Sequence, residues 1–327
     1  MERITAESQA HEAPAPAPAD RTRRRLPRRL AALTGLLLLC ALPARPVGAA
    51  PLHEVRPDTG PPLYVSDYGN DRVVALDTDG SDQTTVSLDG LVRPTGLAWD
   101  RAGSLYASDT GNNRVVRLPP AGSGQSTVPT DGLSRPLGLA VDAAGSLYIA
   151  DSFNDRVVKV RPDGGGQTTV PTTGLLHPWG LALESDGDLY ISDFVNDRVV
   201  KVPGDGSGQS TVPTTGLSQP TGLALSATGD LYVSDSGNDR VVKIAAGTGA
   251  QTTVPTTGLS NPLGLALDHR GNLYVADGFN NRVLRVRPAD GAQTTVNSTG
   301  LNTPTGLAFP PRGNRPPGRI PQTGPAR

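Results

Sequence analysis

The chain has 327 residues and a formal net charge of −1. Its 39 glycines and 31 prolines exclude a helical bundle, because residues that interrupt helices would occur every few positions. The near-neutral charge also gives no indication of nucleic-acid binding.

The first 49 residues have the organisation of an export signal. An Ala/Pro-rich start leads into the basic stretch 21–30 and then into the apolar run 30–44. This run is shorter than the ~20 residues that a membrane span needs. We therefore expect cleavage after Ala49, with an uncleaved N-terminal anchor as the alternative, and a protein that is secreted or lies in the cell envelope. Cys40, the only cysteine, lies in this signal, so the mature chain would form no disulfide.

Beyond residue 62 the sequence is built from a strict internal repeat. The segment LYVSDYGNDRVV begins at Leu63, and related segments begin at Leu105, Leu147, Leu189, Leu231 and Leu273. A second segment, P-x-G-L-A, begins at Pro94, Pro136, Pro178, Pro220, Pro262 and Pro304. Both return every 42 residues. A fixed period of this length is typical of architectures in which one supersecondary unit packs on the next.

Each unit predicts four strands in an antiparallel meander. In the third unit the strands are expected at 138–142, 147–151, 156–161 and 167–170, with turn residues between them. The predicted fold is therefore an all-β, six-bladed β-propeller with four strands in each blade. The first unit begins at its second strand, so we expect the C-terminal strand 306–309 to complete the first blade and close the ring.

These patterns divide the chain into four segments. We expect a signal peptide at 1–49, a lead-in at 50–62, the propeller at 63–309, and a disordered Pro/Gly/Arg tail at 310–327.

The repeated unit, as in GLAVDAAGSLYIADSFNDRVVKV, resembles the NHL repeat over residues 63–309. Among NHL-repeat propellers it is most similar to the extracytoplasmic sensor domain of the mycobacterial receptor serine/threonine protein kinase D. Only 62 residues precede the propeller, so no kinase domain is expected here. The resemblance implies a monomeric, non-enzymatic binding protein. Its partner would be a peptide, a glycan, an envelope protein or a separate membrane kinase.

Other propellers of this kind are enzymes, namely the peptide-amidating lyase, the streptogramin B lyase and gluconolactonase-type lactonases. Resemblance to them implies a divalent metal held by His, Glu, Asp or Asn around the central channel. From residue 61 on, the only histidines are His177 and His269, and the only glutamate is Glu184. The meander places His177 at the opposite end of a blade from the other two, so the three cannot form one metal site.

The sequence therefore predicts no catalytic residue, no metal ligand and no cofactor. A metal-dependent lyase or lactonase with a divalent cation in its channel is the alternative function. An envelope scaffold is a second alternative.

Residues that occur in every unit are predicted to serve the fold. An aspartate ends each second strand, and an arginine begins each third strand. The aspartates are Asp67, Asp109, Asp151, Asp193, Asp235 and Asp277, and the arginines are Arg72, Arg114, Arg156, Arg198, Arg240 and Arg282. Each aspartate is expected to accept turn N–H groups and to pair with its arginine. A cation-binding ring of six aspartates is the alternative.

Residues that break the repeat are candidates for function. Several lie at the end of the blades where the chain enters the first strand and where it passes from the second strand to the third; we call this end the top face, and the other end the bottom face. The aromatic candidates are Tyr68, Phe153, Trp179, Phe194 and Phe279. Aromatic side chains at a concave rim favour a binding surface. Local packing over the channel is the alternative.

The position before the P-x-G proline also varies from unit to unit. It is occupied in turn by Arg93, Arg135, His177, Gln219, Asn261 and Thr303. The two arginines, in neighbouring blades, are suited to a carboxylate or phosphate group, and His177 adds polarity. Ordinary solvated arginines are the alternative. Together with the five aromatics, Arg93, Arg135 and His177 form the predicted ligand-binding set.

Overall fold

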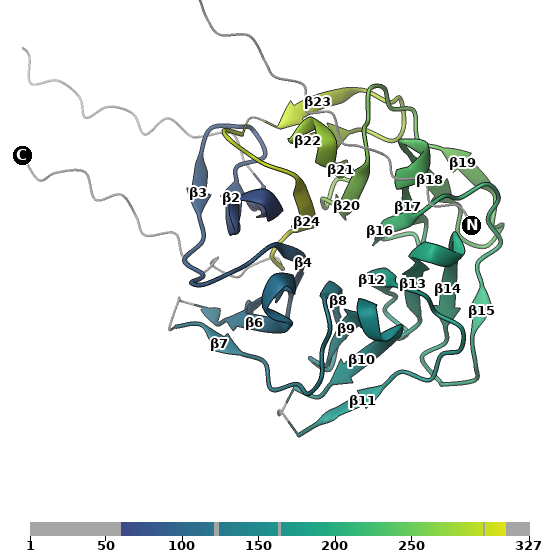
Figure 1. The fold of residues 1–327 in the computed structure, drawn as a ribbon. Coiled ribbons are helices and arrows are strands. Elements are labelled where there is room, and N and C mark those ends of the chain that lie inside the picture. Colours follow the sequence, from purple (N-terminus) through teal and green to yellow (C-terminus); the bar gives the residue numbers. More distant parts are fainter. Residues whose placement is uncertain (1–59, 121–123, 163–164, 297, 312–327) are drawn as a thin grey trace, which may run out of the picture. The chain divides into compact units, whose positions relative to one another are not determined.

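The computed structural model describes residues 60–311, except 121–123, 163–164 and 297. These residues form six four-stranded antiparallel sheets arranged in a ring (Figure 1), which is the six-bladed propeller that the repeat predicts. The expected signal peptide and nearly all of the tail lie outside the described residues. Among those described, no helix has the length and apolar character needed to span a bilayer.

Within each blade the strands follow one another from the central channel outwards. The innermost strands are β4 (Pro94–Trp99), β8 (Pro136–Val141), β12 (Pro178–Leu183), β16 (Pro220–Leu225), β20 (Pro262–Leu267) and β24 (Pro304–Ala308). The second strands are β1 (Leu63–Asp67), β5 (Leu105–Asp109), β9 (Leu147–Asp151), β13 (Leu189–Asp193), β17 (Leu231–Asp235) and β21 (Leu273–Asp277). The third strands are β2 (Arg72–Leu76), β6 (Arg114–Leu118), β10 (Arg156–Val160), β14 (Arg198–Val202), β18 (Arg240–Ile244) and β22 (Arg282–Val286). The outermost strands are β3 (Gln83–Thr85), β7 (Ser126–Thr127), β11 (Gln167–Thr169), β15 (Ser210–Thr211), β19 (Gln251–Thr253) and β23 (Gln293–Val296).

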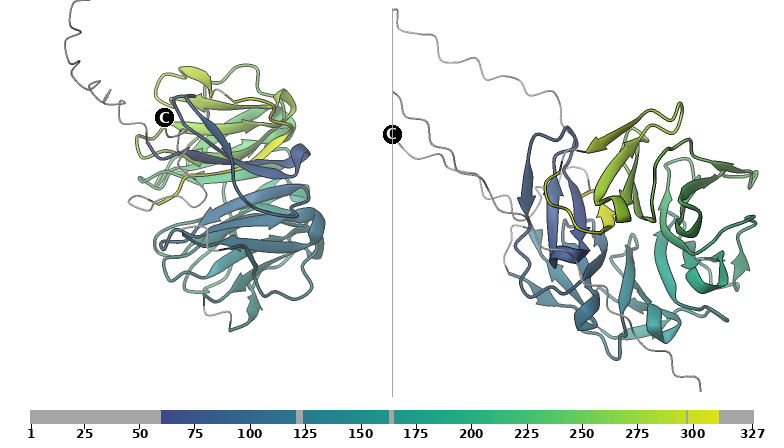
Figure 2. Two further views of the ribbon diagram at one scale, coloured as in Figure 1. Left: turned by 90° about the vertical axis from the view of Figure 1, so that its left-hand side faces the viewer. Right: turned by 45° about the horizontal axis from the view of Figure 1, so that its top comes forward.

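A single turn of 3₁₀ helix joins the second strand of each blade to the third. These turns are η1 (Tyr68–Asn70), η2 (Thr110–Asn112), η4 (Ser152–Asn154), η5 (Phe194–Asn196), η6 (Ser236–Asn238) and η7 (Gly278–Asn280). Seen from the side, the strands run roughly along the ring axis, so the connections gather at two opposite ends of the blades (Figure 2). The six 3₁₀ turns all lie at the top face.

The predicted strands of the third unit are found with small shifts at their ends. The second strand, Leu147–Asp151, has the predicted bounds, and the third and fourth each end one residue early. The first strand begins at Pro136 instead of residue 138, and its pairing with β9 shifts register before Leu139. Proline is tolerated there because β8 has a hydrogen-bonded neighbour on one side only.

The glycine of each P-x-G brings neighbouring innermost strands into close contact. A Cβ atom at any of these glycines would overlap the backbone carbonyl oxygen of the x residue in the next blade; they are Gly96, Gly138, Gly180, Gly222, Gly264 and Gly306. Only glycine, which has no Cβ, therefore allows the two strands to approach this closely. The central channel that results is narrow, with a volume of about 70 Å³, and is lined mainly by glycine and leucine.

Between neighbouring blades the repeated apolar residues form one core cluster for each interface. Tyr148 and Val157 of the third blade, for example, pack with Leu189 and Ile191 of the fourth. Trp99 joins such a cluster, with its ring edge-on to Tyr64 at 4.8 Å between centroids.

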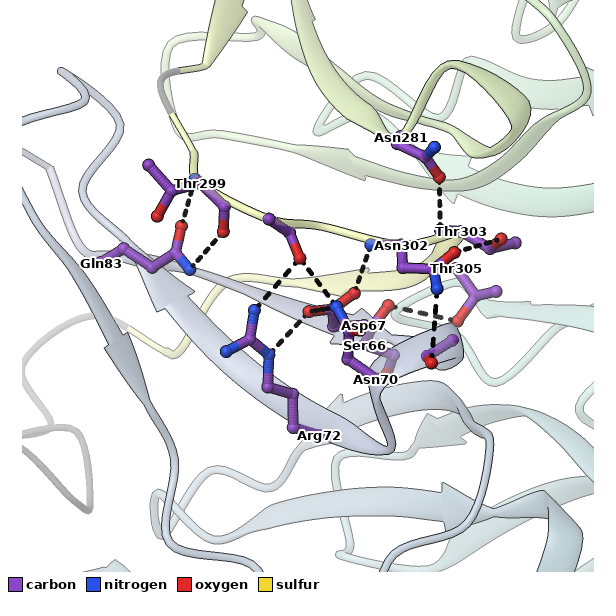
Figure 3. Close-up of polar contacts among 12 residues, drawn as sticks. Ser66, Asp67, Asn70, Arg72, Gln83, Asn281, Thr299, Asn302, Thr303 and Thr305 are labelled. Atoms are coloured by element: carbon purple, nitrogen blue, oxygen red, sulfur yellow. Dashed lines mark hydrogen bonds and ion pairs between the residues drawn. The ribbon is translucent and has the colours of Figure 1, made fainter. Parts of the chain in front are cut away.

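The ring is closed by the C-terminal strand, as predicted. β24 pairs antiparallel with β1, so that Tyr64 lies opposite Ala308. The strand begins at Pro304 and ends before Phe309, two residues earlier than expected at its start. Side chains reinforce the closure: the Asn302 backbone N–H donates to Asp67 Oδ1 at 2.7 Å, and Gln83 Nε2 donates to the Thr299 carbonyl at 3.1 Å (Figure 3).

Candidate ligand site at the top face

The repeated aspartates organise the top face from within each blade. Asp193 is fully buried and accepts hydrogen bonds from Arg198 Nε at 2.7 Å, Asn196 Nδ2 at 2.9 Å and the Leu176 backbone N–H at 2.7 Å. The Arg Nε to Asp Oδ2 distance is 2.6–2.7 Å in all six blades. The first blade shows the same cluster around Asp67 (Figure 3). Each carboxylate is thus held by its own blade instead of facing the channel.

The residues before the P-x-G prolines form a second set, the pre-proline ring: Arg93, Arg135, His177, Gln219, Asn261 and Thr303. All six have φ between 48° and 51°, the left-handed region that side chains other than glycine rarely adopt. Each backbone N–H donates to the side chain of the Asp or Asn that directly follows the 3₁₀ turn of the preceding blade, as from Arg93 to Asp71 Oδ1 at 2.7 Å. The backbone of this ring is therefore uniform, whereas its side chains differ.

A cavity of about 280 Å³ opens at the top face, partly bordered by this ring. We call it the mouth pocket, because Thr95, Leu137, Trp179 and Thr305 also line the channel below it. Its lining residues are Tyr68, Arg93, Thr95, Thr110, Gly111, Arg135, Leu137, Phe153, Trp179, Asn261, Leu263, Thr303 and Thr305. The fifth blade, which begins with β16, contributes none of them. The pocket is therefore asymmetric although the fold is repeated sixfold.

Five of the eight predicted binding residues line the mouth pocket: Tyr68, Phe153, Trp179, Arg93 and Arg135. Two others lie behind them, since the Phe194 ring packs on Trp179 at 5.2 Å and the His177 ring stacks on Phe153 at 4.9 Å. Phe279 is apart from the pocket and 70% exposed. Trp179 was expected in a loop but belongs to strand β12, because the P-x-G segment extends the innermost strand to its proline.

Phe153 is held between two polar side chains. The Arg135 guanidinium lies over its ring at 4.8 Å, and His177 stacks at 4.9 Å. Even so, 49% of Phe153 remains exposed. A cation over an aromatic face is attracted to the ring quadrupole, so this stack orients Arg135 at the rim of the pocket.

The buried hydroxyl groups of the pocket floor are paired within the protein. Thr110 Oγ1 donates to the Pro136 carbonyl at 2.7 Å and lies 2.6 Å from Thr95 Oγ1. Thr305 Oγ1 donates to the Pro94 carbonyl at 3.1 Å. By contrast, the Arg93 and Arg135 guanidinium groups form no hydrogen bond or ion pair with any residue that the structure describes. These two groups are the strongest donors left available in the pocket.

The lining residues do not fit a divalent metal ion. They include no carboxylate and no imidazole, and two arginines would repel a cation. Within the described ranges, the one group of three potential ligands close enough to share a metal is Glu184, Asp186 and Asp188, in the β12–β13 turn at the bottom face.

Lys201 pairs with two of these three carboxylates. Its Nζ lies 2.6 Å from Asp188 Oδ2 and 3.5 Å from Glu184 Oε2. The hydrogen bond from Lys201 lowers the pKa of Asp188 below its usual value.

His269 also lies at the bottom face, in the β20–β21 turn. It is therefore at the opposite end of the blades from His177, as the meander predicts.

Sequence reasoning left Asn261, Thr303 and the floor threonines out of the predicted set. Asn261 and Thr303 belong to the same varying position as Arg93, so the variation itself was the available signal. The floor threonines Thr95 and Thr305 occupy the x position of P-x-G, where three units share threonine; nothing in that pattern distinguishes a pocket residue from a core residue.

The fold and the pocket define a six-bladed propeller with a potential ligand site at one end of its channel. Residues 79–306 match the model of the virginiamycin B lyase family, and the chain therefore belongs to this family. No curated protein matches the sequence.

Solved structures share the fold at low sequence identity. A chain of a nidogen/laminin complex has a TM-score of 0.70 and 23% identity, with coverage of 76% of this chain and 97% of that one. Virginiamycin B lyase from Staphylococcus aureus has a TM-score of 0.58 and 17% identity, with 78% and 90% coverage. A catalytically inactive variant of that lyase with quinupristin has a TM-score of 0.57 and 18% identity, with 79% and 91% coverage. These comparisons give no particular support to the likeness to a kinase sensor domain.

Proposed function

We propose that this protein is an exported binding propeller that holds its ligand in the mouth pocket and does not convert it. The observation that carries the proposal is the asymmetry of the pocket. Aromatic and cationic side chains converge there from some blades, whereas the fifth blade is equally well formed with Gln219, Thr221 and Ser236 at the matching positions. The fold therefore does not require these side chains, and a ligand contact accounts for them.

The distribution of exposed apolar side chains supports the same face. Among the described residues, the large apolar side chains with high exposure are Val92, Phe153, Leu176, Val195 and Phe279. All five lie on top-face loops or 3₁₀ turns. Exposed apolar groups gathered on one face favour contact with a partner. The partner that we propose is a peptide, a glycan or an envelope protein. The export signal that the sequence predicts at residues 1–49 is the reason for proposing that this function lies outside the cytoplasm.

A comparative pull-down from envelope extract and culture supernatant tests the proposal. The baits are the native protein, a variant with Tyr68→Ala, Phe153→Ala and Trp179→Ala, and a bottom-face control with His269→Ala and Arg270→Ala. We expect a partner that the native bait and the bottom-face control retain and that the mouth variant loses while its circular dichroism stays native. Equal retention by all three baits would refute binding at the mouth pocket.

Lyase activity is a second candidate because the family is named for it. Quinupristin or virginiamycin B incubated with the protein, with and without added Mg²⁺, would be followed by mass spectrometry. Turnover that EDTA abolishes would establish an enzyme. We expect no turnover, because the pocket lining offers two arginines in place of metal ligands.

A further inference from the structure

We propose that the ligand of the mouth pocket carries a carboxylate or phosphate group on an apolar body, and that Arg93 and Arg135 bind the anionic group. This inference rests on the proposed function and specifies its ligand. Both arginines belong to the pre-proline ring, they begin neighbouring blades, and both line the same cavity.

The first argument is charge. The pocket lining holds two guanidinium groups and no acidic residue. Many other cations of the blades are paired, as Arg72, Arg114 and the other repeated arginines are with aspartate, and as Lys159, Lys201 and Lys243 are with acids of the bottom face. Two like charges facing one cavity repel each other, and a bound oxyanion removes that repulsion while accepting hydrogen bonds from both.

Acidic residues do lie near the ring, but they are occupied by backbone groups. Asp71 accepts the Arg93 N–H at 2.7 Å, and Asp155 accepts the His177 N–H at 2.8 Å. No ion pair joins either carboxylate to Arg93 or Arg135 within the described part of the chain. The guanidinium groups are therefore available to a ligand.

The second argument is the backbone of the ring. Arg93 has φ of 51° and Arg135 has φ of 48°, a conformation that glycine would adopt without strain. The Arg93 guanidinium forms no hydrogen bond or ion pair with any described residue, although its backbone N–H donates to Asp71. Its side chain therefore contributes little to the fold at a position where a side chain is unfavourable, and a ligand contact gives it a role.

The third argument is the remainder of the lining. Tyr68, Trp179, Leu137 and Leu263 supply aromatic and aliphatic surface, and Asn261 and Thr303 are polar but uncharged. The floor hydroxyls already donate to Pro136 and Pro94 carbonyls. Charged donors thus come only from Arg93 and Arg135, so the ligand's anionic group belongs beside them and its apolar body beside the rings.

Trp179 provides a direct reporter of binding. The sequence has two tryptophans, and Trp99→Phe in the full chain leaves Trp179 as the single tryptophan, which is excited selectively at wavelengths that tyrosine does not absorb. The probes are two matched pairs: N-acetyl-phenylalanine with its amide, and phenyl phosphate with phenol. We expect Trp179 fluorescence to respond to the acid or the phosphate at concentrations at least about tenfold below those needed for the neutral partner. Ligand-observed NMR on the native chain repeats the comparison without any substitution.

Variants locate the anion. Arg93→Gln and Arg135→Gln together should abolish the preference for the charged probe, and Gln219→Ala, in the same ring but outside the pocket, should leave it unchanged. A response to N-acetyl-phenylalanine alone assigns a carboxylate ligand, and a response to phenyl phosphate alone assigns a phosphate ligand.

Three results would overturn the inference. Equal binding of charged and neutral probes would show a pocket that binds ligands without selecting anions, and the proposed function would stand. A preference that survives the double glutamine variant would place the anion elsewhere. If no probe binds, the ligand class is wrong, and the pull-down with the mouth variant then decides the proposed function by itself.

Discussion

Two sets of single residues at the top face relate to the fold in opposite ways. The repeated aspartates are fully buried, and each is held by its own blade. The pre-proline ring has side chains that differ from blade to blade on a left-handed backbone. Substitutions of the repeated aspartates should therefore lower stability strongly. Substitutions in the pre-proline ring should change stability according to how much strain the new residue has at a positive φ.

Asp193→Ala should destabilise the protein by about 3–5 kcal/mol, because it leaves Arg198 Nε and the Leu176 N–H without their acceptor. Urea unfolding followed by circular dichroism measures the change. Asp131→Ala, which removes an exposed carboxylate, should change stability by no more than about 0.5 kcal/mol. Equal effects of the two substitutions would contradict a structural role for the repeated aspartate.

Thr303→Gly should stabilise the fold, by up to about 1 kcal/mol. Thr303 is β-branched and has φ of 51°, so the glycine relieves left-handed strain that exceeds its entropic cost. Thermal unfolding is the measurement. Ala144→Gly, at an exposed turn position without positive φ, should instead destabilise by about 0.5–1 kcal/mol. A loss of stability at Thr303 would mean that its side chain makes a contact worth more than the strain.

At the scale of elements, the spacing of the innermost strands depends on the P-x-G glycines. Gly222→Ala should destabilise by more than about 3 kcal/mol, because its Cβ would overlap the Leu263 carbonyl oxygen and force β16 away from β20. Gly60→Ala is the matched control: its φ is not positive, and its Cβ would lie 3.5 Å from the nearest atom, in His269. Chemical unfolding of the two variants under the same conditions tests the difference.

The bottom ends of β13 and β14 are joined by the Lys201–Asp188 pair, which predicts a pH dependence. The hydrogen bond between Lys201 and Asp188 lowers the pKa of Asp188 from its usual 3.8. The same hydrogen bond raises the pKa of Lys201 above its usual 10.5. The aspartate contribution to stability is therefore present above its unfolded pKa and lost as pH falls through the lowered folded pKa. The lysine contribution is present below its unfolded pKa and lost as pH rises through the raised folded pKa.

Lys201→Met should therefore destabilise by under about 1 kcal/mol at neutral pH, because both side chains of the pair remain partly exposed to solvent, and should have a smaller effect in acid. Thermal unfolding midpoints across a pH series from about 2 to 7 measure this. Arg270→Met, another cation at the bottom face, is the control and should show no such trend. A Lys201→Met effect of the same size at every pH would attribute the loss to packing over Tyr190.

At the scale of the whole molecule, the ring depends on pairing between strands from the two ends of the described chain. A chain that stops at residue 303 lacks β24 and leaves β1 without its inner neighbour. Its unfolding midpoint in calorimetry should fall by at least about 10 °C. A chain that stops at residue 311 keeps β24 and should unfold like the full-length protein. Similar midpoints for both truncations would show that closure is not needed for stability.

The sequence alone predicted most of this architecture because its information is local and repeated. The second strand of the third unit, Leu147–Asp151, was found at its predicted residues, since alternating side chains and flanking turn residues act within a few positions. The start of β8 at Pro136 was missed, because proline is acceptable there only at a strand edge facing the channel. The Asp–Arg pairing followed from spacing within one unit, and the closing strand followed from incomplete units at the two ends.

The mouth pocket was decided by the tertiary structure. Arg93 and Arg135 are 42 residues apart, and Tyr68 and Thr303 are still more distant in sequence. They face one cavity because the sheets form a closed ring whose top-face connections converge on the channel. A strict repeat specifies the same backbone in every blade, but which unlike side chains meet, and which, like Phe279, remain apart, depends on where each blade lies around the axis.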